Sequence, residues 1–190
     1  MNKVNCLGTS RRYLARLTAT LAAIDAEQMD AAVQLVADAW QRGSQIITLG
    51  NGGSSMTALH FINDWNKSIF MKSGKPFLGR SLVDNMGLVM SYANDVSFQD
   101  VFVEQLRNVM RKDDLVLAIS GSGNSENVIR AIDYANANSA VTLGLCGYSG
   151  GTLRERAQHV LWAKVDDMQL SEDVHSIFGH IVMQKLCGSY

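Results

Sequence analysis

The sequence predicts an α/β fold, a three-layer α/β/α sandwich in which helices cover both faces of a parallel sheet, preceded by N-terminal helices. Two observations predict it. Short aliphatic runs alternate with segments of helical periodicity, the pattern of βαβ units around a parallel sheet. Two of these runs end abruptly in glycine, serine and asparagine, the residues of tight turns between a strand and the helix that follows it.

The predicted elements follow one another along the chain. Two amphipathic helices come first, with Leu, Ile and Val at three- and four-residue intervals. Aliphatic strands follow, most of them leading through small residues into a helical pattern, and one polar stretch is typical of a loop. In order, we expect helices over 10–24 and 26–42, a strand over 45–50, a helix over 54–65, a loop over 66–75, strands over 115–120 and 141–147, each followed by a helix, a strand over 159–165, and a last helix over 171–187.

Composition narrows the class of protein. The 190 residues, 47% hydrophobic and 18% charged, suit one domain over 1–190, with helices over 10–42 and a core over 43–190. A net charge of −1 without a dense Lys/Arg cluster argues against nucleic acid or a membrane as partner. Without a secretory signal or an apolar run of about 20 residues, we expect a cytoplasmic protein. Cys6, Cys146 and Cys187 lack the spacing of a disulfide framework or a zinc cluster.

Two glycine-rich turns are candidates for an anion site, "GNGGSS" at 50–55 and "SGSGNS" at 120–125. Ligands of parallel sheets bind beyond the carboxyl ends of the strands, where backbone N–H groups and a helix N-terminus meet an anion. Ser120, Ser122 and Ser125 add hydroxyl donors. The alternative is that these are ordinary βα turns with helix caps. Neither turn has the third glycine of a dinucleotide fingerprint or the lysine of a P-loop, which favours a monophosphate over NAD or ATP.

Five segments from about position 36 onward resemble the sugar isomerase (SIS) family, in particular its phosphoheptose isomerase branch. The resemblance implies the SIS fold with a flavodoxin-like sheet, and homotetramers with sites between subunits. It also implies that Asn51, Gly52, Gly53 and Ser54 line the sugar site, that Asn94 and Asp95 touch sugar hydroxyls, and that Ser120, Gly121, Ser122 and Ser125 hold the phosphate. The segments are GNGGSSMTALHF (50–61), Asn94-Asp95, ISGSGNSENVIRAI (119–132), GYSGGTL (147–153) and SEDVHSIFGHIVMQKL (171–186).

The same resemblance implies a zinc ion held by His60, Asp64, Glu172 and His180, with Glu172 also facing the substrate. Two of the four depart from the family pattern, since Asp64 replaces Glu and Glu172 replaces Gln. His60 and Asp64, at i and i+4, share one helix face. Glu172 and His180 differ by about 80° around a helix, so they share a site only if Glu172 lies in a frayed first turn. The alternative is ordinary ion pairs, His60 with Asp64 and Glu172 with His175.

The implied reaction converts sedoheptulose 7-phosphate to D-glycero-D-manno-heptose 7-phosphate for surface polysaccharide. Such an isomerisation needs a base and an acid on opposite sides of the sugar, for which Asp64 and His180 are the candidates. Two alternatives are a non-catalytic tetrameric scaffold for the replication initiator and a phosphosugar-sensing regulator. The scaffold relative lacks the carboxylate and the terminal histidine that are present here, and a regulator needs a second domain for which 190 residues leave no room.

Overall fold

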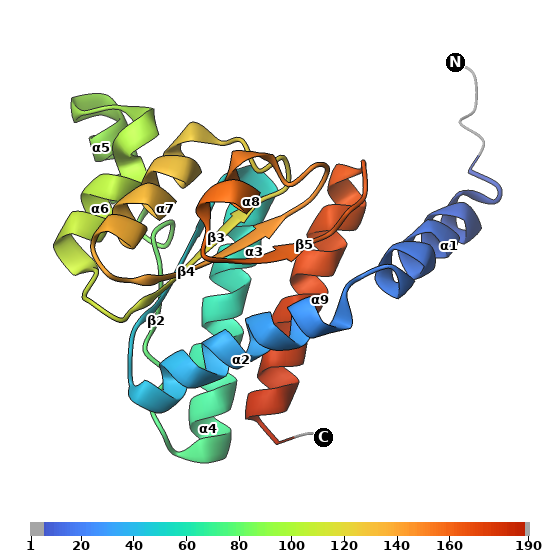
Figure 1. Ribbon diagram of the computed structural model, residues 1–190, viewed down its shortest axis with the longest axis horizontal. Coiled ribbons are helices and arrows are strands. Elements are labelled where there is room, and N and C mark those ends of the chain that lie inside the picture. Colours follow the sequence, from blue (N-terminus) through green and yellow to red (C-terminus); the bar gives the residue numbers. More distant parts are fainter. Residues whose placement is uncertain (1–5, 189–190) are drawn as a thin grey trace.

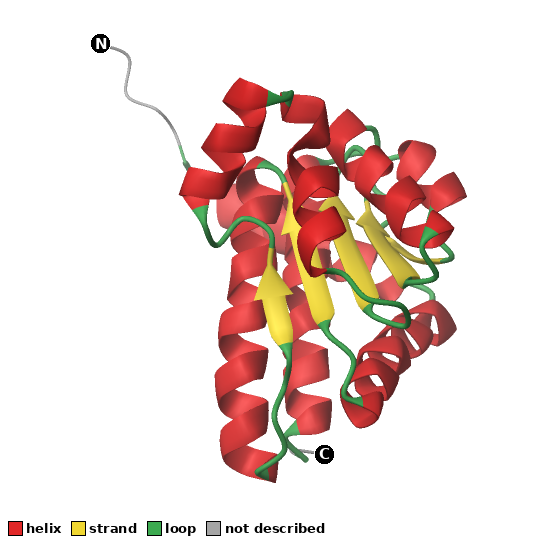
Figure 2. Cartoon of the chain, turned by 90° about the vertical axis from the view of Figure 1, so that its left-hand side faces the viewer, coloured by secondary structure: helices red, strands yellow, loops and turns green. Residues whose placement is uncertain are grey.

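A five-stranded parallel sheet between two layers of helices forms the centre of the protein (Figure 1, Figure 2), as the sequence predicts. The computed structural model describes residues 6–188. The strand order is β2-β1-β3-β4-β5, the flavodoxin-like order, which reverses direction between β1 and β3. The strands are β1 (Ile46–Gly50), β2 (Gly79–Ser81), β3 (Leu115–Ser120), β4 (Val141–Cys146) and β5 (His159–Trp162).

Helices cover both faces of the sheet (Figure 1). On one face lie α2, α3 and α9, and on the other lie α6, α7 and α8. The helices are α1 (Thr9–Ala22), α2 (Ala26–Arg42), α3 (Gly52–Asp64), η1 (Trp65–Ile69), α4 (Phe70–Ser73), α5 (Met86–Asp95), η2 (Phe98–Asp100), α6 (Val101–Val109), α7 (Glu126–Ala137), α8 (Gly151–Arg156) and α9 (Met168–Leu186).

The aliphatic strands form the core because both faces of the sheet are covered. Every residue of β1 and β3 is buried, which explains why these strands are continuous hydrophobic runs and not alternating ones. From α9, Phe178 and Val182 complete this core from one side. The packing therefore fixes the carboxyl ends of β1 and β3 next to each other, with the register Gly50 opposite Ile119.

The predicted loop over 66–75 is wrong, because the helix before it continues to Ser73. After Asp64 the chain makes one π-helical segment, η1, and then α4. Trp65 and Ile69, four residues apart, are completely buried and supply the apolar contacts that hold this extension in place. The last helix begins at Met168, three residues earlier than predicted, since Asp167 caps it by accepting a hydrogen bond from the Leu170 amide at 3.1 Å.

The first helix, α1, lies apart from the rest of the chain (Figure 1). None of its residues is buried. Two polar contacts join it to the beginning of α9: the Tyr13 hydroxyl donates to Asp173 at 2.6 Å, and Arg16 pairs with Asp167 at 2.7 Å. None of the helices in residues 6–188 is long and apolar enough to cross a membrane.

Candidate functional site

A pocket of about 200 Å³ lies where the strand order reverses, beyond the carboxyl ends of β1 and β3. This is the place where doubly wound sheets bind ligands. Three segments enclose it: the turn after β1, the turn after β3, and the beginning of α9. Its lining residues are Asn51, Gly53, Ser54, Ile119, Ser120, Gly121, Ser122, Ser125, Met168 and Glu172.

Two helices begin at this pocket without a side-chain cap. Asn51 and Ser125 are the N-cap residues of α3 and α7, and neither side chain accepts a hydrogen bond from its own helix. The asparagine is bonded instead to Asn127, in a reciprocal pair at 2.8 and 3.0 Å. The Ser125 hydroxyl lies 3.4 Å from that of Ser120. Uncapped amides, the positive ends of two helix dipoles and hydroxyl groups together suit an anion with several oxygens.

Glycines in the two turns leave room for different neighbours. Gly123 has a left-handed φ of 69°, and a Cβ there would overlap the Gly150 carbonyl oxygen. Gly53 has no such φ, but a Cβ on it would overlap the Glu172 carboxylate. The carboxylate thus lies against the first turn of α3, where the helix dipole favours a negative charge.

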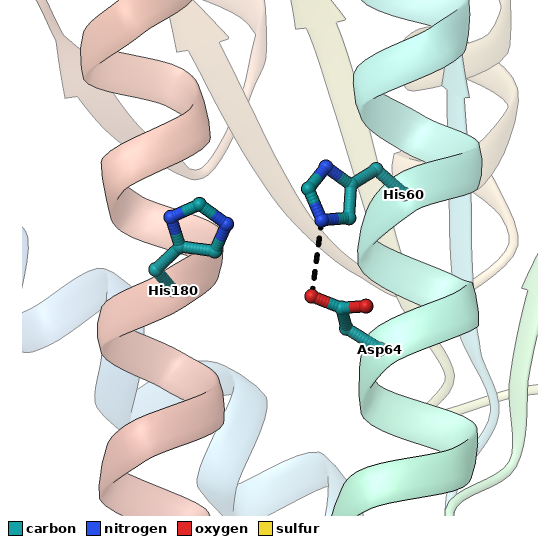
Figure 3. A group of neighbouring side chains, drawn as sticks. All are labelled: His60, Asp64 and His180. Carbon is teal, nitrogen blue, oxygen red and sulfur yellow. Dashed lines mark hydrogen bonds and ion pairs between the residues drawn. The ribbon is translucent and has the colours of Figure 1, made fainter.

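A second group of polar side chains lies further along α3 and α9 (Figure 3). His60 and Asp64 extend from α3, and His180 extends from α9 toward them. One ligand atom from each lies within 4.8 Å of the others. The His60 Nε2 and Asp64 Oδ2 atoms are 3.0 Å apart, and the two imidazole rings meet edge to face with centroids 5.3 Å apart. Both histidines are exposed and Asp64 is half-buried, so a ligand has access to all three.

Close packing of α3 against α9 brings this group together. Gly179 leaves room for the Phe61 ring, because a Cβ there would overlap it. The Trp65 indole donates a hydrogen bond to the Gly179 carbonyl at 3.0 Å. The π-helical segment η1 begins immediately after Asp64; such local departures from α geometry are frequent at functional sites.

The pocket and the His60, Asp64 and His180 group lie along one line between two parallel helices. Gly53 meets Glu172 at the pocket end, and His60 meets His180 further along. Seven residues of α3 and eight of α9 separate the two levels, which at 1.5 Å per residue is about 10 to 12 Å. An extended molecule with an anionic end in the pocket would therefore reach the imidazoles with its other end.

Several residues singled out from the sequence do not meet in these places. Glu172 lies in the pocket and is not part of the group formed by His60, Asp64 and His180. It is the fifth residue of α9, whose first turn is capped by Asp167 and not frayed. Asn94 and Asp95 are exposed near the end of α5, where they bond to each other at 2.8 Å and do not line the pocket. Gly52 lines a neighbouring hollow beside Met86 and Phe98.

Three residues of the site, Ile119 among them, are absent from the predicted site residues. Asn127 is buried and holds Asn51, and Met168 lines the pocket. An asparagine in the first turn of a buried helix is an available signal for Asn127. No pattern in the sequence indicates Met168, because the turn after β3 and the start of α9 meet only in the folded chain.

One histidine of α9 is buried in the protein interior. His175, on α9, is completely buried, and neither ring nitrogen has a hydrogen-bond partner among the described residues. Burial lowers its pKa to about 4, although the backbone of Cys146 opposes the shift. His175 is thus neutral at pH 7 and is part of the packed interior.

Comparison with known proteins gives a consistent result. A family model described as the SIS domain matches residues 11–147. The probable phosphoheptose isomerase of Thermoplasma acidophilum is 30% identical over 173 residues, which cover 91% of this chain and 94% of that protein. The phosphoheptose isomerase of Campylobacter concisus is 32% identical over 156 residues, 82% of each chain. A solved phosphoheptose isomerase from Francisella tularensis, 21% identical, has a TM-score of 0.85 over 98% of this chain and all of that one, which shows the same fold.

Proposed function

Because this chain belongs to the SIS domain family, we propose that it is a phosphoheptose isomerase. The reaction is the conversion of sedoheptulose 7-phosphate to D-glycero-D-manno-heptose 7-phosphate, a step in making heptose for surface polysaccharide. One observation carries the proposal: an anion-type pocket and a group with two imidazoles and a carboxylate lie about 10 Å apart along the same pair of helices. A sugar with a phosphate at one end and a carbonyl at the other fits that arrangement.

The phosphate binds at the uncapped starts of α3 and α7. Ser120, Ser122 and Ser125 donate hydroxyl hydrogen bonds to its oxygens, and backbone amides at the two helix N-termini complete the site. Glu172, beside Gly53, accepts hydrogen bonds from sugar hydroxyls next to the phosphate. We also propose Asn94 and Asp95 as sugar-binding residues, although both are exposed and neither lines this pocket.

The isomerisation moves protons and leaves the oxidation level of the whole sugar unchanged. A proton leaves C1, the C2 carbonyl oxygen gains one, the C1 hydroxyl loses one, and a proton returns to C2 of the enediol. Asp64 takes the carbon-bound proton as general base. His180 moves protons between the oxygens, for which an imidazole is suited near neutral pH. The two side chains extend from different helices, and their ligand atoms lie within 4.8 Å, so both reach the same end of the sugar.

The donor set also fits a divalent metal, for which we propose zinc. Two imidazole nitrogens and a carboxylate oxygen are a common zinc ligand set, and three protein ligands leave a coordination position open. When bound, such an ion polarises a carbonyl oxygen. His60, Asp64 and His180 would each give it one ligand atom, so Asp64 and His180 would transfer protons through their second carboxylate oxygen and second ring nitrogen. Glu172 lies at the pocket, about 12 Å along α9 from His180.

We propose that the protein acts as a homotetramer in the cytoplasm, where sugar phosphates are produced. The support for assembly is α1, a helix without buried residues on which Leu14 and Leu21 are 58% and 37% exposed. These side chains would be buried by a neighbouring subunit. Light scattering after size-exclusion chromatography measures the assembly directly.

The function is tested by incubating the purified protein with sedoheptulose 7-phosphate and separating the products by chromatography. We expect conversion to the heptose 7-phosphate, and a loss of about 100-fold or more in kcat for Asp64→Asn and for His180→Ala. Asp133→Asn and His159→Ala are the matched controls, because Asp133 pairs with Arg156 on the surface and His159 is exposed on β5. Both controls should keep the activity of the unchanged protein.

The same experiment separates the proposed enzyme from a binding protein. A protein that binds the phosphosugar but converts none of it, with or without added zinc, would refute the isomerase and favour a scaffold or a sensor. Equal losses in the variants and their matched controls would refute the assignment of Asp64 and His180.

A further inference from the structure

The beginning of α9 forms one wall of the phosphate-type pocket. Met168 and Glu172, four residues apart on one face of this helix, both line the pocket. Each lies against a glycine in one of the two turns: Glu172 against Gly53, and Met168 against Gly121. The thioether of Met168 is thus placed beside the turn that carries the three serine hydroxyls.

Gly121 leaves room for this neighbour. Its backbone does not have the left-handed φ that demands glycine, in contrast with Gly123 two residues later. A Cβ on Gly121 would, however, overlap the Met168 Sδ atom and lie 3.2 Å from its terminal methyl. The absence of a side chain at 121 therefore provides space for Met168, and the two residues act as one unit.

We propose that Met168, seated on Gly121, is a specificity-determining residue that restricts the pocket to phosphates carried on an unbranched, primary carbon. The inference rests on the proposed function, because it assumes that the three serines hold a phosphate. When the ester oxygen of this phosphate lies on the α9 side, the carbon bonded to it lies next to the Met168 side chain. A CH₂ group fits beside this side chain, whereas a carbon that carries two further substituents overlaps the thioether.

Two isomers test the proposal, since glycerol 3-phosphate carries its phosphate on a primary carbon and glycerol 2-phosphate on a secondary one. Their composition and charge are the same. Binding is measured by calorimetry, with inorganic phosphate as a third probe. We expect the unchanged protein to prefer glycerol 3-phosphate about tenfold, the scale at which an apolar wall discriminates by one or two carbon atoms. Met168→Ala should reduce the preference to about twofold, and Met168→Leu, of similar volume, should keep it.

The matched control is Met71→Ala, the same change at a side chain on α4 that is 75% exposed. It should leave the preference unchanged. Gly121→Ser tests the pairing: it should weaken binding of glycerol 3-phosphate about tenfold alone and much less in combination with Met168→Ala, the non-additivity expected of touching residues. Circular dichroism of each variant confirms that it is folded.

The results distinguish the role of Met168 from the presence of the phosphate pocket. An unchanged preference in Met168→Ala, or the same loss from Gly121→Ser in both backgrounds, would overturn the role of Met168 while inorganic phosphate still binds. Failure of the unchanged protein to bind inorganic phosphate would refute the phosphate pocket of the proposed function, and the inference with it.

Discussion

Replacing Gly179 by alanine should separate α3 from α9 and thereby weaken both the fold and the group formed by His60, Asp64 and His180. A Cβ at 179 would overlap two carbon atoms of the Phe61 ring and lie 3.0 Å from a third, Cζ. Non-bonded carbon atoms prefer about 3.5 to 4 Å, so the ring or the helix must move by more than about 1 Å. Phe61 is held in turn by the stacked ring of Trp65 at 4.8 Å and has little space to yield.

The expected cost is about 1 to 3 kcal/mol of unfolding free energy, the range for adding a methyl group to a full core. Urea denaturation measures it, with Ser176→Ala on the same helix as control, which should cost less than about 0.5 kcal/mol if its hydroxyl only donates to the Glu172 carbonyl. Phe61→Leu should restore part of the loss in combination with Gly179→Ala, because the smaller side chain vacates the overlapped space.

The second readout is zinc affinity, measured by competition with a coloured chelator at pH 7. A shift of about 1 Å between the helices changes the distance from His180 to His60, and we expect about tenfold weaker binding, the usual effect of disturbing the support of a metal ligand. A variant that loses stability as expected but binds zinc like the unchanged protein would refute the claim that this helix contact sets the spacing of the two histidines. No loss of stability would refute the packing argument itself.

Three further predictions concern charge and protonation. Glu172→Gln should bind inorganic phosphate about tenfold more tightly by calorimetry, because it removes a negative charge from a partly buried anion pocket; equal or weaker binding would contradict this. His60→Ala should lower zinc affinity at least about tenfold, as measured by chelator competition, whereas His159→Ala should not. His175 has a pKa near 4 in the folded protein and near 6.5 in the unfolded chain. Between these pH values the unfolded state binds more protons than the folded state. The free energy of unfolding therefore falls by up to about 1.4 kcal/mol per pH unit on acidification from pH 6.5 to 4. In urea titrations at pH 6 and 5, His175→Phe should show a smaller pH dependence than the unchanged protein, and an identical slope would contradict the assignment.

The sequence predicts the fold well where a pattern is repeated and buried on both sides. The strands β1, β3 and β4 are predominantly hydrophobic and almost completely buried. The second helix has the predicted bounds, Ala26–Arg42, because Asp25 caps its start and Gly43 ends it in a left-handed conformation. The strand β2 has only three residues at the sheet edge and no hydrophobic run. Polar residues between Trp65 and Ile69 give the extension through η1 the appearance of a loop. The spacing of four between these two apolar residues is nevertheless helical.

The sequence pattern likewise predicts one part of the candidate site and not the other. The serines and glycines of each turn are close in sequence, and the two turns meet in the pocket because the carboxyl ends of the adjacent parallel strands β1 and β3 lie at one edge of the sheet. Asp64 and His180 come from helices that are far apart in the chain, so only the resemblance to a known family paired them. Glu172 was grouped with the two histidines by that same resemblance, yet two helical turns separate it from His180.

The absence of a side-chain cap at the N-termini of α3 and α7 lowers the stability of the protein without ligand. A side-chain cap stabilises a helix by about 1 kcal/mol. The helices α2, α5 and α9 have such a cap, whereas α3 and α7 lack one. The unliganded molecule is therefore less stable than the same fold with both ends closed, and an oxyanion that occupies the pocket restores the missing bonds. Melting temperature should accordingly rise with phosphate concentration, so that an occupant of the pocket would also stabilise the fold that holds it.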